Sequence, residues 1–471
     1  MRKATKLYAL LGVLLVVCIA AFAVSRYEEK KEQIKNSGEV ILEIPTDSVT
    51  ALSWTNDSGT FSFTKDETWV YDDDNAFPVD EEKINNMLEQ FTSFAAAFAI
   101  DDVEDYAQYG LDEPICTIRI TAGEKSYTVE LGDFSKMDEQ RYVSIGDGKV
   151  YLASEDPYDS YSVVLRDMIR NDTIPSFNTA SQITFSGEES YTIVRDENGK
   201  SIDQDDVYFV DGNPVDTTNV SSYLSVLRSL SLTEYVSYNV TAAELSEFGL
   251  DEPNLTVELA YIVNDSDGNE TDTGSLTLHI AQNPEEAAAY EEAVQKNLAD
   301  LPDVTCYVRV GQSQIVYKIS QDVYDQLTDV SYNTMRHQSL FTADFDTVTS
   351  IDVALSGENY TFTYNPPEDK DDEDAEGTWT YNGEEFDVYD LRTALRAISA
   401  TSFTDETPTG QEEISLTVHL DNEDFPTFTL TLYRLDGTNC IATVDGKAVA
   451  LVSRSKTVDL IEAVNELTLG S

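Results

Sequence analysis

Apolar residues follow two patterns along this chain. Many short runs place an apolar residue at every second position, and a few longer segments place one at every third or fourth position. The first pattern predicts half-buried strands and the second predicts amphipathic helices. Strand pairs, then a helix, then further strands occur in this order three times. The sequence therefore predicts an α+β protein of three related units with mainly antiparallel sheets.

The helix of each predicted unit follows an aspartate that is preceded by an apolar residue. Asp80, Asp216 and Asp387 stand where a helix N-cap accepts hydrogen bonds from first-turn amides. The apolar residue before each aspartate and the one four positions after it predict a hydrophobic staple. The apolar helix positions are Ile84, Met87, Leu88, Phe91 and Phe94, then Val220, Tyr223, Leu224, Leu227 and Leu230, then Leu391, Ala394, Leu395 and Ile398.

Strand-like runs surround each of these helices. Alternating runs precede the helix at 49–54 with 60–63, 183–185 with 191–194, and 348–353 with 360–363. Runs at 116–120 and 127–131 follow the first helix, and each unit closes with two runs joined by a turn, at 141–152, 306–319 and 440–451. We expect an anchor and linker over 1–37 and units over 38–172, 173–340 and 341–471. The segment 284–299, rich in Glu and Ala, predicts a surface helix inserted in the second unit.

An acidic hexapeptide occurs twice, as YGLDEP at 109–114 and FGLDEP at 248–253. In the second copy, Thr241 to Glu244 has the pattern of a capping box, and Gly249 suits the left-handed residue that ends a helix. The proline then favours extended backbone before the next strand. The two neighbouring acids point apart in an extended segment, so we interpret the hexapeptide as a helix-to-strand joint and not as a catalytic pair.

The order of these motifs resembles the bacterial family catalogued as domain of unknown function 4340. The residues that carry the resemblance are Trp69, Tyr71, Pro78 to Asp80, Tyr109 to Pro114, Tyr142, Val143, Val150 and Tyr151, and in the second copy Tyr208, Pro214 to Asp216, Phe248 to Pro253, Tyr307, Val308, Val316 and Tyr317. The resemblance implies an N-terminally anchored protein without established catalytic residues. It also implies a companion of an ABC-type export or gliding-associated transport system.

The chain carries 88 acidic and 30 basic residues among 471, a formal charge of −58. This charge repels nucleic acid and other polyanions, and it leaves cations and basic protein surfaces as partners. Two acidic loops, 264–274 and 368–377, are candidates for weak Ca²⁺ binding. The second begins like a calcium loop with Asp372, Asp374 and Glu376, but Gly383 stands where such a loop has Glu.

The N-terminus begins with basic residues and continues with an uncharged, mainly apolar run from Leu7 to Val24. As a helix this run is about 27 Å long, close to the thickness of the hydrocarbon core of a bilayer. It predicts a single-pass anchor in the cell membrane with the bulk of the chain outside the cytoplasm. A signal peptide cleaved after Ala21-Phe22-Ala23 is the alternative.

No residue pattern identifies a catalytic, cofactor-binding or metal-binding site. Cys18 lies in the apolar run, and Cys116, Cys306 and Cys440 show neither CxxC spacing nor an even number for pairing, so we interpret those three as structural. His279, His337 and His419 lack the HExxH pattern, and no GxSxG or phosphate-binding glycine motif is present.

We therefore expect no enzyme and no cofactor, but an extracytoplasmic accessory or scaffold protein with a membrane or transport protein as partner. A glycan- or cation-binding module is the alternative, and a hydrolase that uses two carboxylates is a further one.

Overall fold

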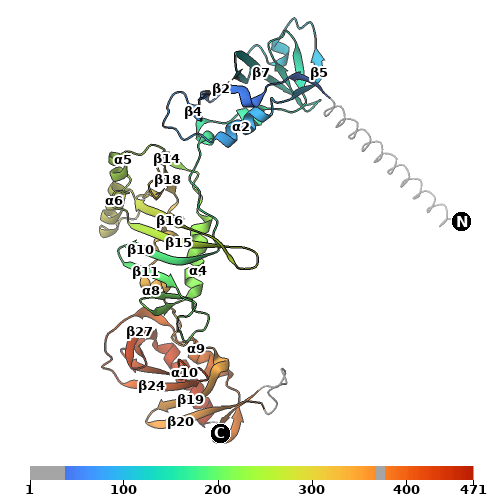
Figure 1. The fold of residues 1–471 in the computed structure, drawn as a ribbon. Coiled ribbons are helices and arrows are strands. Elements are labelled where there is room, and N and C mark those ends of the chain that lie inside the picture. Colours follow the sequence, from blue (N-terminus) through green and yellow to red (C-terminus); the bar gives the residue numbers. More distant parts are fainter. Residues whose placement is uncertain (1–37, 368–376, 470–471) are drawn as a thin grey trace, which may run out of the picture. The chain divides into compact units, whose positions relative to one another are not determined.

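The computed structural model describes residues 38–367 and 377–469, which form an α+β fold with three nine-stranded sheets (Figure 1). Every strand pair whose register is known is antiparallel, as in β2 with β6 and β15 with β16. The predicted fold class is thus confirmed for the sheets and their number. The predicted membrane anchor, Cys18 and the acidic segment 368–376 lie outside the described residues.

The first sheet has the strand order β1-β5-β9-β8-β7-β6-β2-β3-β4. Its strands are β1 (Glu39–Leu42), β2 (Val49–Asn56), β3 (Gly59–Lys65), β4 (Trp69–Tyr71), β5 (Phe94–Ile100), β6 (Cys116–Ala122), β7 (Lys125–Ser135), β8 (Gln140–Ser144) and β9 (Val150–Ala153). Its helices are α2 (Glu81–Glu89) and α3 (Tyr158–Tyr161), with 3-10 turns η1 (Thr46–Ser48), η2 (Ala107–Tyr109) and η3 (Leu165–Met168).

The second sheet has the order β13-β12-β11-β10-β15-β16-β17-β18-β14. Its strands are β10 (Thr179–Gly187), β11 (Ser190–Arg195), β12 (Tyr208–Val210), β13 (Asn213–Val215), β14 (Tyr235–Ser237), β15 (Leu255–Asn264), β16 (Glu270–Gln282), β17 (Cys306–Val310) and β18 (Val316–Ile319). Its helices are α4 (Thr217–Ser229), α5 (Ala242–Glu247), α6 (Pro284–Gln295), α7 (Gln321–Thr328) and α8 (Tyr332–Met335). Helix α6 confirms the helix predicted for the insertion.

The third sheet has the order β22-β21-β20-β19-β24-β25-β26-β27-β23. Its strands are β19 (Val348–Leu355), β20 (Glu358–Asn365), β21 (Thr378–Tyr381), β22 (Glu384–Phe386), β23 (Ala400–Phe403), β24 (Glu412–Leu420), β25 (Thr427–Arg434), β26 (Asn439–Val444) and β27 (Lys447–Ser453). A 3-10 turn, η4 (Phe345–Thr347), precedes the sheet, and its helices are α9 (Tyr389–Arg396) and α10 (Arg454–Leu469).

The three sheets share one topology over eight strands. The series β4-β3-β2-β6-β7-β8-β9-β5 has the same chain order as β12-β11-β10-β15-β16-β17-β18-β14 and as β21-β20-β19-β24-β25-β26-β27-β23. The first sheet adds β1 at one edge, whereas the other two add β13 or β22 at the opposite edge. The repeat inferred from the sequence is therefore a repeat of structure.

One helix in each repeat connects the two edges of the shared eight-strand series. Helix α2 follows β4 and leads to β5, α4 leads to β14, and α9 leads to β23. The predicted apolar positions that lie within the helices are buried, among them Ile84, Leu224 and Leu391. The prediction extended each helix too far, because Phe91, Leu230 and Ile398 lie beyond the helix ends and Phe94 belongs to β5. A helix with such a stripe covers one face of a sheet and supplies half of its core.

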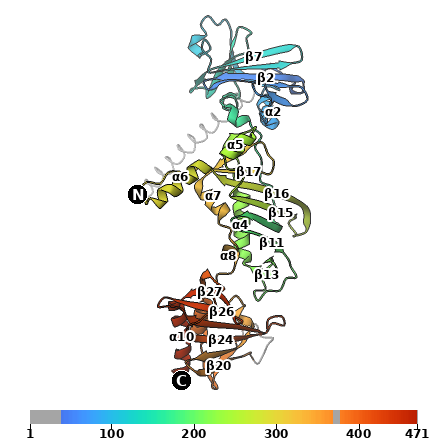
Figure 2. The same ribbon diagram turned by 90° about the vertical axis from the view of Figure 1, so that its left-hand side faces the viewer.

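The core of the third sheet shows this layering. Alternate residues of β19 and β24, such as Ile351 and Leu416, are fully buried together with Leu395 of α9. Helix α10 packs beside α9 and adds Leu460 and Val464 to the same core. Figure 2 shows α10 along the strands of this sheet, next to the labels of β24 and β26. Two helices on one face of an antiparallel sheet therefore make the core.

Two of the three predicted N-caps are confirmed. Asp80 accepts hydrogen bonds from the amides of Glu82 and Lys83, and Asp216 accepts them from Thr218 and Asn219. The prediction for Asp387 is wrong, because Val388 is the N-cap of α9 and already has helical backbone angles. The Asp387 carboxylate instead accepts one hydrogen bond from the amide of Tyr389.

The hexapeptide forms a helix-to-strand joint in both copies. Thr241 and Glu244 make the capping box of α5, and Gly249 has φ 72°. The amide of Leu250 donates to the carbonyl of Leu245, and Leu250 is buried. Gly110 has φ 68° after η2, and Leu111 donates to Tyr106 in the same way. The four acids of the two copies are exposed, as a joint at the surface requires.

Residues 38–172 form one compact unit together with Ser237–Asn239, and the remaining described residues form a second, which contains the third sheet and most of the second. Cys116, Cys306 and Cys440 are buried free thiols, and burial raises their pKa values.

Within residues 38–367 and 377–469, no helix has the length and apolar character needed to cross a membrane.

The different cap geometries predict different costs of removal. We expect Asp80→Ala to lower the free energy of opening of α2 by about 0.5–2 kcal/mol, since two amides lose their acceptor. Asp387→Ala removes a single hydrogen bond and should cost α9 less. Amide hydrogen exchange of the peptides that contain the two helices measures both values, and equal losses would contradict the assignment of Val388 as the cap.

Candidate functional site

The candidate site lies in the second compact unit, where the segment after α8 meets the start of α4. The amide of Asp216 donates to the carbonyl of Met335, and the Asn219 side chain donates to the carbonyls of Thr334 and Arg336. This places Arg336 and His337 against the loop that joins β11 to β12. The first repeat has the same docking, in which the Asp80 amide donates to the Met168 carbonyl.

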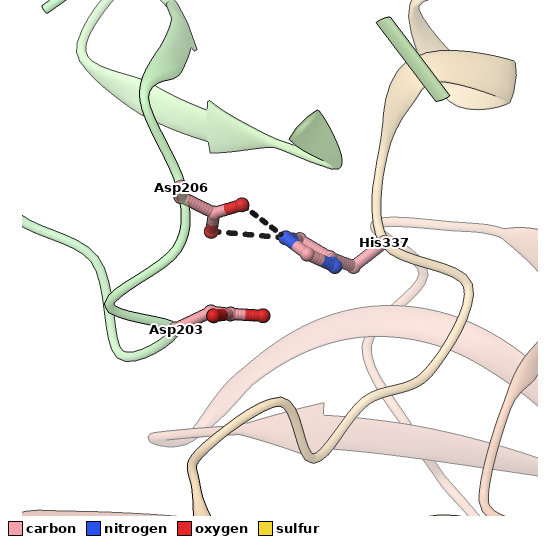
Figure 3. A group of neighbouring side chains, drawn as sticks. All are labelled: Asp203, Asp206 and His337. Atoms are coloured by element: carbon pink, nitrogen blue, oxygen red, sulfur yellow. Dashed lines mark hydrogen bonds and ion pairs between the residues drawn. The ribbon is translucent and has the colours of Figure 1, made fainter. Parts of the chain in front are cut away.

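Asp203, Asp206 and His337 form a compact group at this junction (Figure 3). The Nε2 atom of His337 lies 2.9 Å from both carboxylate oxygens of Asp206. The Asp206 side chain is only 2% exposed and that of His337 is 19% exposed. Ser201 donates its hydroxyl to Asp206, and Asp216 lies 3.7 Å from Nδ1 of His337. The imidazole therefore stands between two carboxylates.

These surroundings shift two pKa values. Burial lowers the pKa of His337, but the hydrogen bond to Asp206 and the charges of Asp206, Asp216 and Asp203 outweigh it, so the net pKa is raised. Burial is the main reason that the pKa of Asp203 is raised as well, and the nearby Asp206 adds to it. The imidazole of His337, paired with the buried Asp206 carboxylate, therefore keeps its proton to a higher pH than a free histidine does.

The group contains the residue types of a hydrolytic triad, but not its geometry. In a triad the serine hydroxyl is hydrogen-bonded to the histidine, which accepts its proton. Here the hydroxyl of Ser201 donates to the carboxylate of Asp206 instead. One imidazole nitrogen and two carboxylates are also a donor set that binds zinc or manganese. The atoms offered by the three residues lie within 4.8 Å of one another.

A cavity of about 550 Å³ adjoins this group and shares His337 with it. Its apolar lining includes Ile202, Leu340, Phe403, Phe425 and Phe428. Lys200 and Arg336 line it as well, and Lys200 makes an ion pair with Asp424. A concave apolar site with a few charged groups is the usual form of a small-molecule pocket.

The sequence did not identify this site. The residue types of Asp203 and Asp206 are too common in a chain with 88 acids to stand out, and 131 residues separate Asp206 from His337. In the sequence, His337 is one of three histidines and belongs to no motif. The sequence signal that could have singled out His337 is its place beside Arg336 in a loop, since the other two histidines lie in strand-like runs.

The other two histidines lie in strands, His279 in β16 and His419 in β24. His279 of β16 contacts the hydroxyl of Thr256, and burial is the main reason that its pKa is lowered. His419 of β24 pairs with Asp352 at 2.8 Å on an exposed face. Neither belongs to a group of three potential metal ligands among the described residues.

The comparison with protein families decides the family of the chain. The model of the domain of unknown function DUF4340 matches residues 69–211 and 210–418. The chain belongs to the DUF4340 family. The first match begins at β4, and the second begins at the last residue of β12, the strand equivalent to β4, and continues into β24 of the third sheet. No curated protein sequence matches the chain.

The pair of His337 and Asp206 predicts a loss of stability on mutation. We expect Asp206→Asn to lower the local free energy of opening by about 1.5–3 kcal/mol, since a hydrogen bond between charged groups is lost from a buried position. Hydrogen exchange of peptides covering 201–210 measures the change. Asp205→Asn is the control, because Asp205 is an exposed neighbour outside the group.

The same pair predicts a pH dependence. A raised pKa of His337 in the fold adds stability that is complete below the unfolded pKa of about 6.5 and is lost as the pH rises through the folded pKa. The protection of 201–210 should therefore decrease above about pH 6.5 in the wild type, after correction for intrinsic exchange. Asp206→Asn should flatten this decrease, and an unchanged profile would contradict the pairing.

Proposed function

We propose that this chain is a membrane-anchored, extracytoplasmic, non-enzymatic accessory or scaffold protein, and that it acts as a companion of an ABC-type export or gliding-associated transport system. The observation that supports the proposal best is the serial repetition of one sheet topology three times. Repetition multiplies similar surfaces along one chain, which suits a protein that presents binding surfaces to a partner complex.

Charge and the N-terminal sequence support the same proposal. The apolar run from Leu7 to Val24 has the length of a membrane span, and a formal charge of −58 favours basic protein surfaces as partners. Membership of the DUF4340 family is consistent with it, but the family carries no assigned activity.

The proposal predicts where the full chain is found and what it binds. We expect it to sediment with membranes after a high-salt wash, and mild crosslinking in cells to join it to membrane transport proteins. Leu14→Arg with Val17→Arg is the matched variant, because two charges within the apolar run oppose its insertion. Crosslinking that recovers only this chain, or sedimentation that the variant does not change, would contradict the proposal.

Cation binding is the second candidate, and the group of Asp203, Asp206 and His337 favours it. Because a ligating histidine must be neutral, an ion would bind better as the pH rises. Titration calorimetry with Zn²⁺ and with Mn²⁺ should then show one site, and Asp203→Asn should weaken it about tenfold or more. Absence of heat, or an equal effect of Asp205→Asn, would count against a cation site. The glycan-binding and hydrolase alternatives stay predictions.

A further inference from the structure

The cavity beside His337 is lined by a cationic side chain, that of Arg336, together with apolar side chains. Arg336 lines the cavity, and its Cζ atom lies 3.8 Å from the centre of the Phe403 ring and 5.5 Å from that of Tyr332. These cation–π contacts involve the charge of the guanidinium and occupy none of its N–H donors, which remain for a polar ligand.

Arg336 makes few polar contacts for a half-buried arginine. Its side chain donates one hydrogen bond, from Nη1 to Oδ1 of Asn333 at 3.3 Å, although a guanidinium has five N–H donors. Within the described parts of the chain, no carboxylate forms an ion pair with it. Burial accordingly lowers its pKa. In a chain with 88 acidic residues, a half-buried guanidinium without a carboxylate indicates that its counter-ion comes from elsewhere.

The other cations of the cavity are already paired. Lys200 binds Asp424, and His337 binds Asp206. Asp445, a carboxylate in the lining, accepts a hydrogen bond from the amide of Thr429. One positive charge is therefore available to a ligand, and the apolar side chains of Ile202, Leu340 and Phe425 surround the space next to it.

We propose that this cavity binds a carboxylate with an apolar body, with the carboxylate on the guanidinium edge of Arg336 and the apolar body against Phe403 and Phe425. A planar carboxylate matches the fork of an arginine with two parallel hydrogen bonds. The volume of about 550 Å³ is within the usual range for small ligands. This inference goes beyond the proposed scaffold function and does not depend on it.

A single negative charge suits the cavity better than a double one. Asp206 and Asp445 lie in or next to its wall, and the formal charge of the chain is −58. A phosphate with two charges would meet this repulsion with one guanidinium to offset it. A carboxylate carries one negative charge at neutral pH, so the single positive charge of Arg336 balances it.

The carboxylate has two natural sources, a free organic acid or the C-terminus of a peptide. Both sources offer the same carboxylate to Arg336, so the experiment uses one set of probes for free acids and another for peptide C-termini. The free acids are 3-phenylpropionate and octanoate, each compared with the alcohol of the same carbon skeleton. The peptide is an acetylated tetrapeptide that ends in two phenylalanines, with a free or an amidated C-terminus.

Titration calorimetry on the wild-type full chain is the first test. We expect one site per chain for at least one free acid or for the free peptide, and at least about tenfold weaker binding of its alcohol or amide, as expected for charge-assisted hydrogen bonds. The class that binds more tightly identifies the source. If no acid binds better than its neutral partner at millimolar concentration, the proposal is wrong.

Variants form the second test. Arg336→Gln should weaken the acid about tenfold or more and leave the neutral partner unchanged, whereas Arg336→Lys should retain part of the preference. Arg392→Gln is the matched control, because Arg392 also lies over a ring, that of Phe345, but does not line the cavity. Equal weakening by Arg392→Gln, or none by Arg336→Gln in a chain with wild-type hydrogen exchange, would overturn the assignment.

Discussion

The burial of one sheet face under a helix that links opposite edges is the constraint on which the rest of this structure depends. In each repeat, the edge strand enters a helix whose apolar stripe lies against the sheet, and the chain then continues on the other edge. The helix must start at a fixed place for its stripe to meet the strands. Asp80 and Asp216 fix that place through first-turn amides and through their own backbone amides, which bind the segment that leaves the sheet.

The hydrogen bond from the backbone amide of Asp216 to the carbonyl of Met335 creates the candidate site. Because the backbone of Asp216 holds Met335, the next residues, Arg336 and His337, are held over the loop that contains Asp203 and Asp206. The same structural joint in the first repeat has Arg170 two residues after Met168, so the repeat supplies the position and the second copy supplies the histidine. A cavity lined by Arg336 then adjoins the ion pair of His337 and Asp206.

The fold could be predicted from the sequence to a large extent because its signals are local. The caps of α2 and α4, the hairpin pairs and the helix-to-strand joints at Gly110 and Gly249 depend on residues within a few positions of one another. Asp387 shows the limit of such reasoning, since a one-residue shift of the helix start depends on the backbone angles of Val388. The site could not be predicted, because Asp206 and His337 are brought together only by the completed sheet and by the docking of Met335 on α4.

The crossing of the helix from edge to edge also has a kinetic consequence. Strand β23 pairs with β27, about 50 residues further along the chain, so the contact of Phe403 with Ala450 closes a long loop that contains β24, β25 and β26. Contacts of such long sequence separation form late, because the entropy of loop closure precedes their gain. Phe403, the ring that lies 3.8 Å from Arg336, is therefore expected to be among the last residues of the third sheet to reach their place. A ligand that contacts Phe403 would therefore bind the native chain and not the unfolded one, and would raise the free energy of unfolding by mass action.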